Sequence, residues 1–289
     1  MTLSRNRVLV TGARGQLAGA ILESFAGHAD VLAYSRDDLD ITNPDGVMTR
    51  MRHDRPDAII NCASYNEVDA AEDQPERALT VNSFGVRVLA RAAAEIGATL
   101  VHYSTDFVFD GKTTRPYSEE DATNPRSVYA QSKLLGEWFA ADTPRAFVLR
   151  VESLFGGATP KSSLDRIVAA ISRGEAVRAF VDRTVSPSYV HDVAAATKTL
   201  LVKGKPGLYH CVNSGFCSWY ELALEAATLT GSTNARIIGV SVADVPLRAP
   251  RPQFAALSND KLRTFVNMPT WRDALRRYLT EHPLARYDS

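Results

Sequence analysis

The stretch Arg7–Ala18, with the sequence RVLVTGARGQLA, decides the fold. Its first five residues are mostly aliphatic or β-branched, which predicts a short buried strand. Gly12 and Gly15 follow, and an apolar helical pattern then begins. Glycines at these positions let the backbone turn tightly and approach a pyrophosphate, which the free N–H groups of the next helix would stabilise. Because the loop lies between a strand and a helix, it predicts a dinucleotide-binding site.

The same alternation of strand and helix continues as far as residue 150. Strands are predicted at residues 31–34, 58–61, 99–104 and 146–150, and helices at residues 16–26, 43–53, 75–96 and 127–141. Such alternation is typical of parallel strands joined by right-handed crossovers. The predicted fold class is therefore α/β, with a Rossmann-like doubly wound parallel sheet in a dinucleotide-binding domain over residues 1–150.

Residues 151–289 form a less regular half. Loops rich in Gly, Pro and Ser separate helices predicted at residues 164–172, 191–202, 219–230 and after residue 270. Ser218 and Glu221 have the spacing of a capping box at the start of the third of these helices. This half is expected to be mainly a smaller substrate-binding domain, with part of it returning to the sheet.

The amino-acid composition argues against several classes of function. The 289 residues include 33 Lys and Arg and 33 Asp and Glu, so the formal net charge is zero. A balanced charge argues against nucleic acid or an anionic membrane as a partner. No apolar run approaches the roughly 18 residues of a membrane span and the N-terminus does not resemble a signal peptide, so a cytoplasmic location is expected. The three cysteines lack CxxC spacing and the six histidines form no HExxH motif, so no metal is expected.

Ser35 and Arg36 end the second predicted strand, where an acidic residue would favour NAD. An arginine there can instead hold the 2′-phosphate of NADP. NADPH is therefore the expected cofactor, although two aspartates follow directly and NADH is the alternative. Asp40 and Ile41 are expected to reach the adenine ring, with the carboxylate accepting a hydrogen bond from the exocyclic amine.

Tyr129 and Lys133 lie four residues apart on a predicted helix, so their side chains share one face. A nearby ammonium would lower the pKa of the tyrosine, which could then donate a proton to a developing alkoxide or take one back. Thr105 and Asp106 follow the strand at residues 99–104, at the sheet edge where ligands bind in such folds. Thr105 is expected to hydrogen-bond and polarise a substrate carbonyl. Together these side chains predict a carbonyl reductase.

These segments resemble the extended short-chain dehydrogenase/reductases, and within them the dTDP-4-dehydrorhamnose reductases and related sugar-nucleotide reductases. The resemblance extends over nearly the whole chain and rests above all on STDFVFDG (104–111) and YAQSKLLGE (129–137). It implies an oxidoreductase that uses NADPH to reduce the C4 keto group of a nucleotide-linked 4-keto-6-deoxy sugar, as in dTDP-rhamnose biosynthesis. The expected partner is the small-molecule nucleotide sugar, with a homodimer left open.

The resemblance also assigns roles to residues of this chain. Thr105, Tyr129 and Lys133 match the catalytic residues, and Arg251 matches a residue facing the nucleotide portion of the substrate. With the residues named above, the cofactor-binding set comprises Gly12, Gly15, Gln16, Leu17, Ser35, Arg36, Asp40, Ile41, Cys62, Ala63, Ser64 and Lys133. The substrate-binding set comprises Thr105, Asp106, Tyr129, Glu152 and Arg251. Asn82 matches an asparagine near the active site, and no metal requirement follows, since Ala20 stands where some relatives carry a glutamate linked to a metal-mediated dimer.

Two stretches depart from the family pattern. RVESLFG (150–156) stands where the family usually has Arg-Thr-Ser-Trp-Val-Tyr-Gly, so that Glu152 brings in an acid and Leu154 is taken to replace the aromatic residue expected near the sugar. DRTVSPS (182–188) replaces Asp-Gln-x-Gly-x-Pro-Thr. Glu152 is expected either to accept a hydrogen bond from a sugar hydroxyl or to pair with a nearby arginine. Both departures lie in the substrate half, so the identity of the sugar stays open.

Two other functions compete with the reductase. A non-catalytic NADP-binding regulatory subunit, resembling that of methionine adenosyltransferase, would share the fold. A sugar-nucleotide epimerase or dehydratase would return the hydride and would usually carry an acid at the end of the second strand. The presence of Thr105, Tyr129 and Lys133 favours the reductase over the first alternative, and Arg36 favours it over the second.

Overall fold

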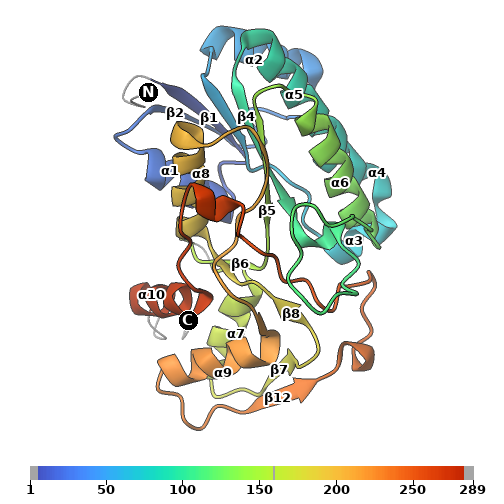
Figure 1. The fold of residues 1–289 in the computed structure, drawn as a ribbon, viewed down its shortest axis with the longest axis vertical. Helices are drawn as coiled ribbons and strands as arrows, with labels where there is room; N and C mark the ends of the chain where they lie inside the picture. Colours follow the sequence, from blue (N-terminus) through green and yellow to red (C-terminus); the bar gives the residue numbers. More distant parts are fainter. Residues whose placement is uncertain (1–5, 159, 283–289) are drawn as a thin grey trace.

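A parallel sheet of six strands organises the upper half of the molecule in Figure 1. The computed structural model describes residues 6–158 and 160–282, so the first residues of the N-terminal stretch and the last residues of the predicted second domain lie outside the described part. The strand order is β10-β5-β4-β3-β1-β2. The strands are β1 (Arg7–Thr11), β2 (Asp30–Tyr34), β3 (Ala58–Asn61), β4 (Thr99–Thr105), β5 (Ala146–Val151) and β10 (Gly207–His210).

Helices cover both faces of this sheet. One face carries α1 (Gln16–Phe25) and α8 (Val190–Lys203), and the other carries α2 (Pro44–Asp54), α5 (Gly85–Ile96) and α6 (Val128–Ala141). Along β1, Val8 and Val10 pack toward α1 and α8, whereas Leu9 packs toward α2 and α5. Strands covered on both faces are apolar throughout, because side chains alternate between two dry layers. The predicted doubly wound sheet is confirmed.

The helix predicted over residues 75–96 is interrupted, so that prediction is wrong in detail. The structure has α4 (Pro75–Leu79), a π-helical turn at Thr80–Phe84 and then α5. The turn points Asn82 inward, where its amide donates to the Tyr65 carbonyl oxygen at 3.0 Å and to the Ser132 hydroxyl at 3.0 Å. Such bulges are frequent at functional sites, and the hydrophobic period of a helix does not signal them.

The smaller lobe occupies the lower half of Figure 1. There α7 (Ser163–Ser172) and α9 (Trp219–Leu229) pack with the parallel pair β7 (Val177–Phe180) and β12 (Ile237–Val240), and α10 (Trp271–Glu281) packs against α9. The predicted capping box starts α9, with the Glu221 amide donating to the Ser218 hydroxyl at 3.1 Å. The shorter elements are α3 (Val68–Asp73), β6 (Leu154–Phe155), β8 (Thr184–Val185), β9 (Ser188–Tyr189), β11 (Cys217–Ser218) and 3₁₀ turns at Asp106–Val108, Val242–Asp244 and Leu262–Thr264.

Two elements that follow residue 150 in the chain belong to the sheet layers. β10 pairs with β5, and α8 packs against α1. The chain therefore leaves the sheet after β5, builds part of the smaller lobe, and returns before building the rest. This path brings the carboxyl ends of the strands against the smaller lobe.

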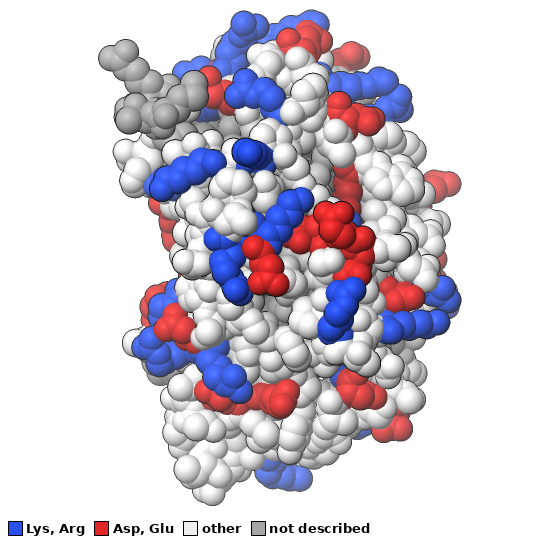
Figure 2. Space-filling view, in the orientation of Figure 1, with Lys and Arg blue, Asp and Glu red and all other residues white. Residues whose placement is uncertain are grey.

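The surface carries both signs of charge. Figure 2 shows acidic and basic side chains interspersed over this face, in keeping with a formal net charge of zero. No helix in the described ranges is both long enough and apolar enough to cross a membrane. The cysteines Cys62, Cys211 and Cys217 are free thiols, and the described residues include no cluster of three or more His, Cys, Asp or Glu side chains suited to a metal.

Candidate active site

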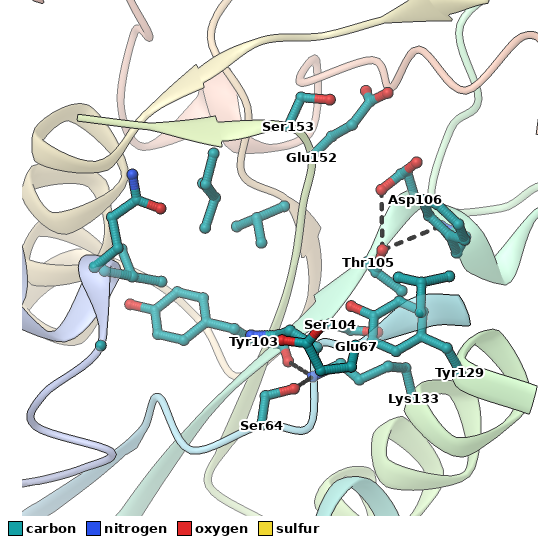
Figure 3. Close-up of a pocket in the computed structure, with 18 of the residues that line it drawn as sticks. Ser64, Glu67, Tyr103, Ser104, Thr105, Asp106, Tyr129, Lys133, Glu152 and Ser153 are labelled. Atoms are coloured by element: carbon teal, nitrogen blue, oxygen red, sulfur yellow. Dashed lines mark hydrogen bonds between the residues drawn. The ribbon is translucent and has the colours of Figure 1, made fainter. Parts of the chain in front are cut away.

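A cavity of about 590 Å³ lies at the carboxyl ends of the strands, between the sheet and the smaller lobe (Figure 3). Most of the side chains predicted to bind cofactor or substrate line it. They are Gly15, Gln16, Leu17, Cys62, Ala63, Ser64, Thr105, Asp106, Tyr129, Lys133, Glu152 and Arg251. The fold therefore gathers residues from six segments of the chain into one site.

The glycine loop has the geometry of an anion-binding turn. Gly12 has a φ of +65°, and a Cβ placed there would lie 2.7 Å from the backbone nitrogen of Ala63, so only glycine fits. Gly15 caps α1 without a side-chain hydrogen bond, and the first residues of that helix line the cavity. The N–H groups at the start of α1 are thus free to bind a pyrophosphate. These residues fit a dinucleotide cofactor.

Tyr129 lies buried in the cavity close to Thr105 (Figure 3). Burial, reinforced by the charge of Asp106, raises the pKa of the Tyr129 hydroxyl, and the Thr105 hydroxyl offsets this only in part. The expectation that an ammonium lowers this pKa is therefore wrong for the structure. The hydroxyl carries its proton at neutral pH, as an ordinary tyrosine also does, and a raised pKa restricts donation to a strongly basic oxygen such as a developing alkoxide.

The hydrogen bonds of Lys133 go to groups other than the Tyr129 hydroxyl. Its Nζ donates to the backbone oxygen of Tyr103 at 2.6 Å and to the Ser64 hydroxyl at 3.5 Å. Ser64 in turn donates to the Asn82 side chain at 3.0 Å, so the π-helical turn helps to hold the lysine. Burial lowers the pKa of Lys133 to about 8, against the opposing effects of Glu137 and Cys62.

Thr105 and Asp106 form a linked pair at the end of β4. The Thr105 hydroxyl donates to Asp106 Oδ1 at 2.9 Å and accepts from the backbone N–H of Phe107 at 3.2 Å. Burial raises the pKa of Asp106 to about 6, although Arg183 and the Thr105 hydrogen bond favour its ionised form. The Thr105 hydroxyl is therefore fixed at the cavity wall by backbone and carboxylate together.

Glu152 is buried at the end of β5 and faces the cavity. Its Oε2 accepts from the backbone N–H of Ser186 at 2.7 Å. Burial, together with the charge of Asp106, raises its pKa well above the usual range, while Arg183 attracts it electrostatically. No arginine within the described ranges forms an ion pair with it, so its attraction to Arg183 acts over more than contact distance.

The sequence did not predict Arg183 as a site residue, and the family's aromatic position was assigned to Leu154, one residue too late. Arg183 lines the cavity and belongs to the stretch 182–188, whose departure from the family pattern was the available signal. Counted letter by letter, the family's Trp falls on Ser153 and not on Leu154. Ser153 and Leu154 both line the cavity, and Ser153 has a φ of 45°. The cavity wall here is polar and small instead of aromatic.

The residues predicted to bind the adenosine half lie outside this cavity. Arg36 and Asp40 line a separate surface depression of about 670 Å³. The Ser35 hydroxyl donates to Asp38 at 2.6 Å, and Asp40 accepts from the Thr42 hydroxyl at 2.7 Å. Ile41 is buried in the core against α5, so its side chain packs within the protein. Of the four, Arg36 is the exposed one.

Arg251 reaches the cavity from the C-terminal part of the chain. Its guanidinium donates to Asp69 at 2.8 Å and to the backbone oxygen of Ala249 at 3.1 Å. It also lies 5.7 Å from the centre of the Phe107 ring. A half-buried guanidinium at a cavity wall is suited to a phosphate group, which it can bind with two parallel hydrogen bonds.

Residues 6–283 match the family described as RmlD substrate binding domain. The spore coat polysaccharide biosynthesis protein SpsK of Bacillus subtilis is 34% identical over 282 residues, covering 96% of this chain and 99% of that protein. The dTDP-4-dehydrorhamnose reductase of Mycobacterium tuberculosis H37Rv is 38% identical over 281 residues, covering 93% and 91% of the two chains. The crystal structure of dTDP-4-dehydrorhamnose reductase from Bacillus anthracis in complex with NADP is 31% identical, has a TM-score of 0.92 and covers 96% of this chain and 99% of its own. The chain therefore belongs to the RmlD substrate binding domain family.

Proposed function

We propose that this protein uses NADPH to reduce the C4 keto group of a nucleotide-linked 4-keto-6-deoxy sugar. The observation that carries the proposal is the convergence of Thr105, Tyr129 and Lys133 in one cavity with the free start of α1. The relatives named dTDP-4-dehydrorhamnose reductase support the substrate class, and the related structure with NADP supports the cofactor.

The chain offers a binding group for each part of the cofactor. The N–H groups that follow Gly15 would hold the pyrophosphate, Lys133 would hydrogen-bond the nicotinamide ribose, and Arg36 would pair with the 2′-phosphate. When bound, NADPH supplies the hydride. The protein's part is to orient the substrate and to stabilise charge as it develops.

Tyr129 and Thr105 act on the carbonyl oxygen. The Thr105 hydroxyl is held at the cavity wall and can turn its proton from Asp106 to the substrate oxygen. Tyr129 is protonated at neutral pH, and it gives its proton to the alkoxide oxygen as negative charge develops. Arg251 would bind the diphosphate and so place the sugar between these residues and the cofactor.

The competing functions have less support. A binding subunit without catalysis would not need Thr105, Tyr129 and Lys133 around one cavity. An epimerase or dehydratase usually has an acid at the end of the second strand, whereas Arg36 stands here. Net consumption of NADPH separates the reductase from both alternatives.

The proposal is tested by comparing a nucleotide-linked 4-keto-6-deoxy sugar with the free keto sugar. The remote nucleotide should help to position the reacting carbon, so the free sugar should lose kcat as well as affinity. NADPH oxidation followed by absorbance gives both parameters. Equal efficiency on the free sugar or on an unrelated aliphatic ketone would leave only a generic reductase.

The pH dependence of kcat/KM should report the ionisation of the Lys133 ammonium. Its pKa is lowered to about 8, so the ammonium that is present below this pH is lost as pH rises through it. We expect kcat/KM, which reports the free enzyme, to fall above about pH 8. Lys133→Arg keeps its charge at all these pH values, so its residual activity should decline only at higher pH. Identical falling limbs in the two proteins would show that another group is responsible.

A further inference from the structure

Five polar atoms of residues that line the cavity are buried without a hydrogen-bond partner among the described residues: Asp106 Oδ2, Glu152 Oε1, Arg183 Nε, Ser104 Oγ and Trp219 Nε1. The first three belong to ionisable side chains. Among these three, Asp106 and Glu152 are 3% and 2% exposed. Buried polar atoms in native proteins are nearly always paired, so a cluster of unpaired ones in a cavity indicates that a ligand supplies the missing partners.

Each of the two acids has one oxygen fixed by the protein and the other free. Thr105 donates to Asp106 Oδ1 and the Ser186 backbone donates to Glu152 Oε2, which orients both carboxyl groups. Figure 3 shows both of them on the same side of the cavity as Thr105. The free oxygens are therefore held in place close to where the substrate carbonyl would bind.

The hydrogen-bonding properties of Asp106, Glu152 and Arg183 determine which group of a ligand can pair with all three. An ionised carboxylate only accepts hydrogen bonds, whereas a protonated carboxyl also donates one, and burial favours the protonated form of Glu152 by raising its pKa. The Arg183 guanidinium can only donate. A hydroxyl group does both, since it donates one proton and accepts through its lone pairs. An ammonium could only donate and would leave the Arg183 Nε–H without an acceptor, and an apolar group would leave all three atoms unpaired.

We propose that Asp106, Glu152 and Arg183 form a hydroxyl-recognition site, which selects a keto sugar that keeps free ring hydroxyls beside the reacting carbonyl. This inference rests on the proposed function for its substrate class. Glu152 and Arg183 lie in the two stretches that depart from the family pattern, and Ser153, which also lines the cavity, stands where that pattern has an aromatic side chain. The chain thus recognises the sugar by hydrogen bonds to hydroxyl groups where the family pattern has an aromatic ring.

The test compares three substrates in the wild type and two variants. The substrates are a dTDP-linked 4-keto-6-deoxy hexose and its 2-deoxy and 3-deoxy counterparts, assayed by NADPH oxidation. A hydrogen bond to a charged group corresponds to roughly 10- to 150-fold in binding, so the wild type should disfavour at least one deoxy sugar by about this factor in kcat/KM. Glu152→Leu should remove most of that preference, and Glu152→Gln, which still hydrogen-bonds, should retain part of it.

Glu175→Leu is the matched control, because Glu175 is an exposed acid paired with Arg173 in the smaller lobe. It should leave the preference unchanged. The same comparison is made by calorimetry with the NADPH-loaded protein, using the dTDP-linked 6-deoxy hexose and its deoxy counterparts, which already carry a hydroxyl at C4 and cannot be reduced. A binding preference that Glu152→Leu abolishes, without turnover of any keto sugar, would refute the proposed function and support the recognition site. Equal binding of the three sugars by the wild type, equal losses on all three in Glu152→Leu, or no binding at all would overturn the recognition site.

Discussion

Replacing Tyr129 with Phe is expected to lower turnover by about 10²–10⁴-fold, the range that general acid catalysis usually contributes. The change removes one oxygen atom from a buried ring and leaves the T-shaped contact of that ring with Phe107 in place. The fold and the affinity for NADPH should therefore stay close to those of the wild type. Single-turnover kinetics with the nucleotide-linked keto sugar would measure the chemical step directly.

Tyr209→Phe provides the matched control for this prediction. The Tyr209 hydroxyl donates to the backbone oxygen of Lys205 at 2.7 Å, and neither residue lines the cavity. Losing it should have little effect on turnover. If Tyr129→Phe kept more than half of the wild-type rate while chemistry limited that rate, Tyr129 could not be the proton donor.

Arg36→Ala should weaken the binding of NADPH and leave the binding of NADH nearly unchanged. The two acids that follow Arg36 are engaged elsewhere, since Asp37 pairs with Arg14 at 2.7 Å and Asp38 accepts from Ser35. Arg36 itself has no ion pair within the described ranges, so its guanidinium is available to a 2′-phosphate. A hydrogen bond to a charged group contributes roughly 1.5–3 kcal/mol, which corresponds to about 10- to 150-fold in affinity.

Fluorescence titration with both cofactors measures this effect. Arg52→Ala serves as the control, because Arg52 is another exposed arginine of the same half and pairs with Glu95 at 2.7 Å. It should change neither affinity. Equal affinity of the wild-type protein for NADPH and NADH would contradict the role given to Arg36.

Local signals made the sheet and the reacting residues predictable. The glycine loop was predictable because the positive φ of Gly12 and its close approach to Ala63 leave no room for another residue. The spacing of Tyr129 and Lys133 placed both on one face of α6, and Thr105 was located by the end of its strand. Each of these inferences needs only the period of one element or the rules of one turn.

The features that were missed depend on contacts between distant parts of the chain. The direction of Lys133 is set by Tyr103 and Ser64, which lie on other elements. The π-helical turn exists because Asn82 finds partners across the helix pair. The strands β7 and β12 pair only with each other and lie outside the strand–helix alternation that marked the main sheet. Arg183 becomes a site residue only when the smaller lobe closes over the sheet.

The central claim is tested most directly by following the transferred hydrogen. NADPH that carries deuterium at the reactive position of the nicotinamide is incubated with a nucleotide-linked 4-keto-6-deoxy sugar, and the product is examined by mass spectrometry and NMR. The account predicts one deuterium at C4 of the sugar for each NADPH oxidised, and almost none with Tyr129→Phe. An unlabelled product, or a changed sugar without net oxidation of NADPH, would contradict it.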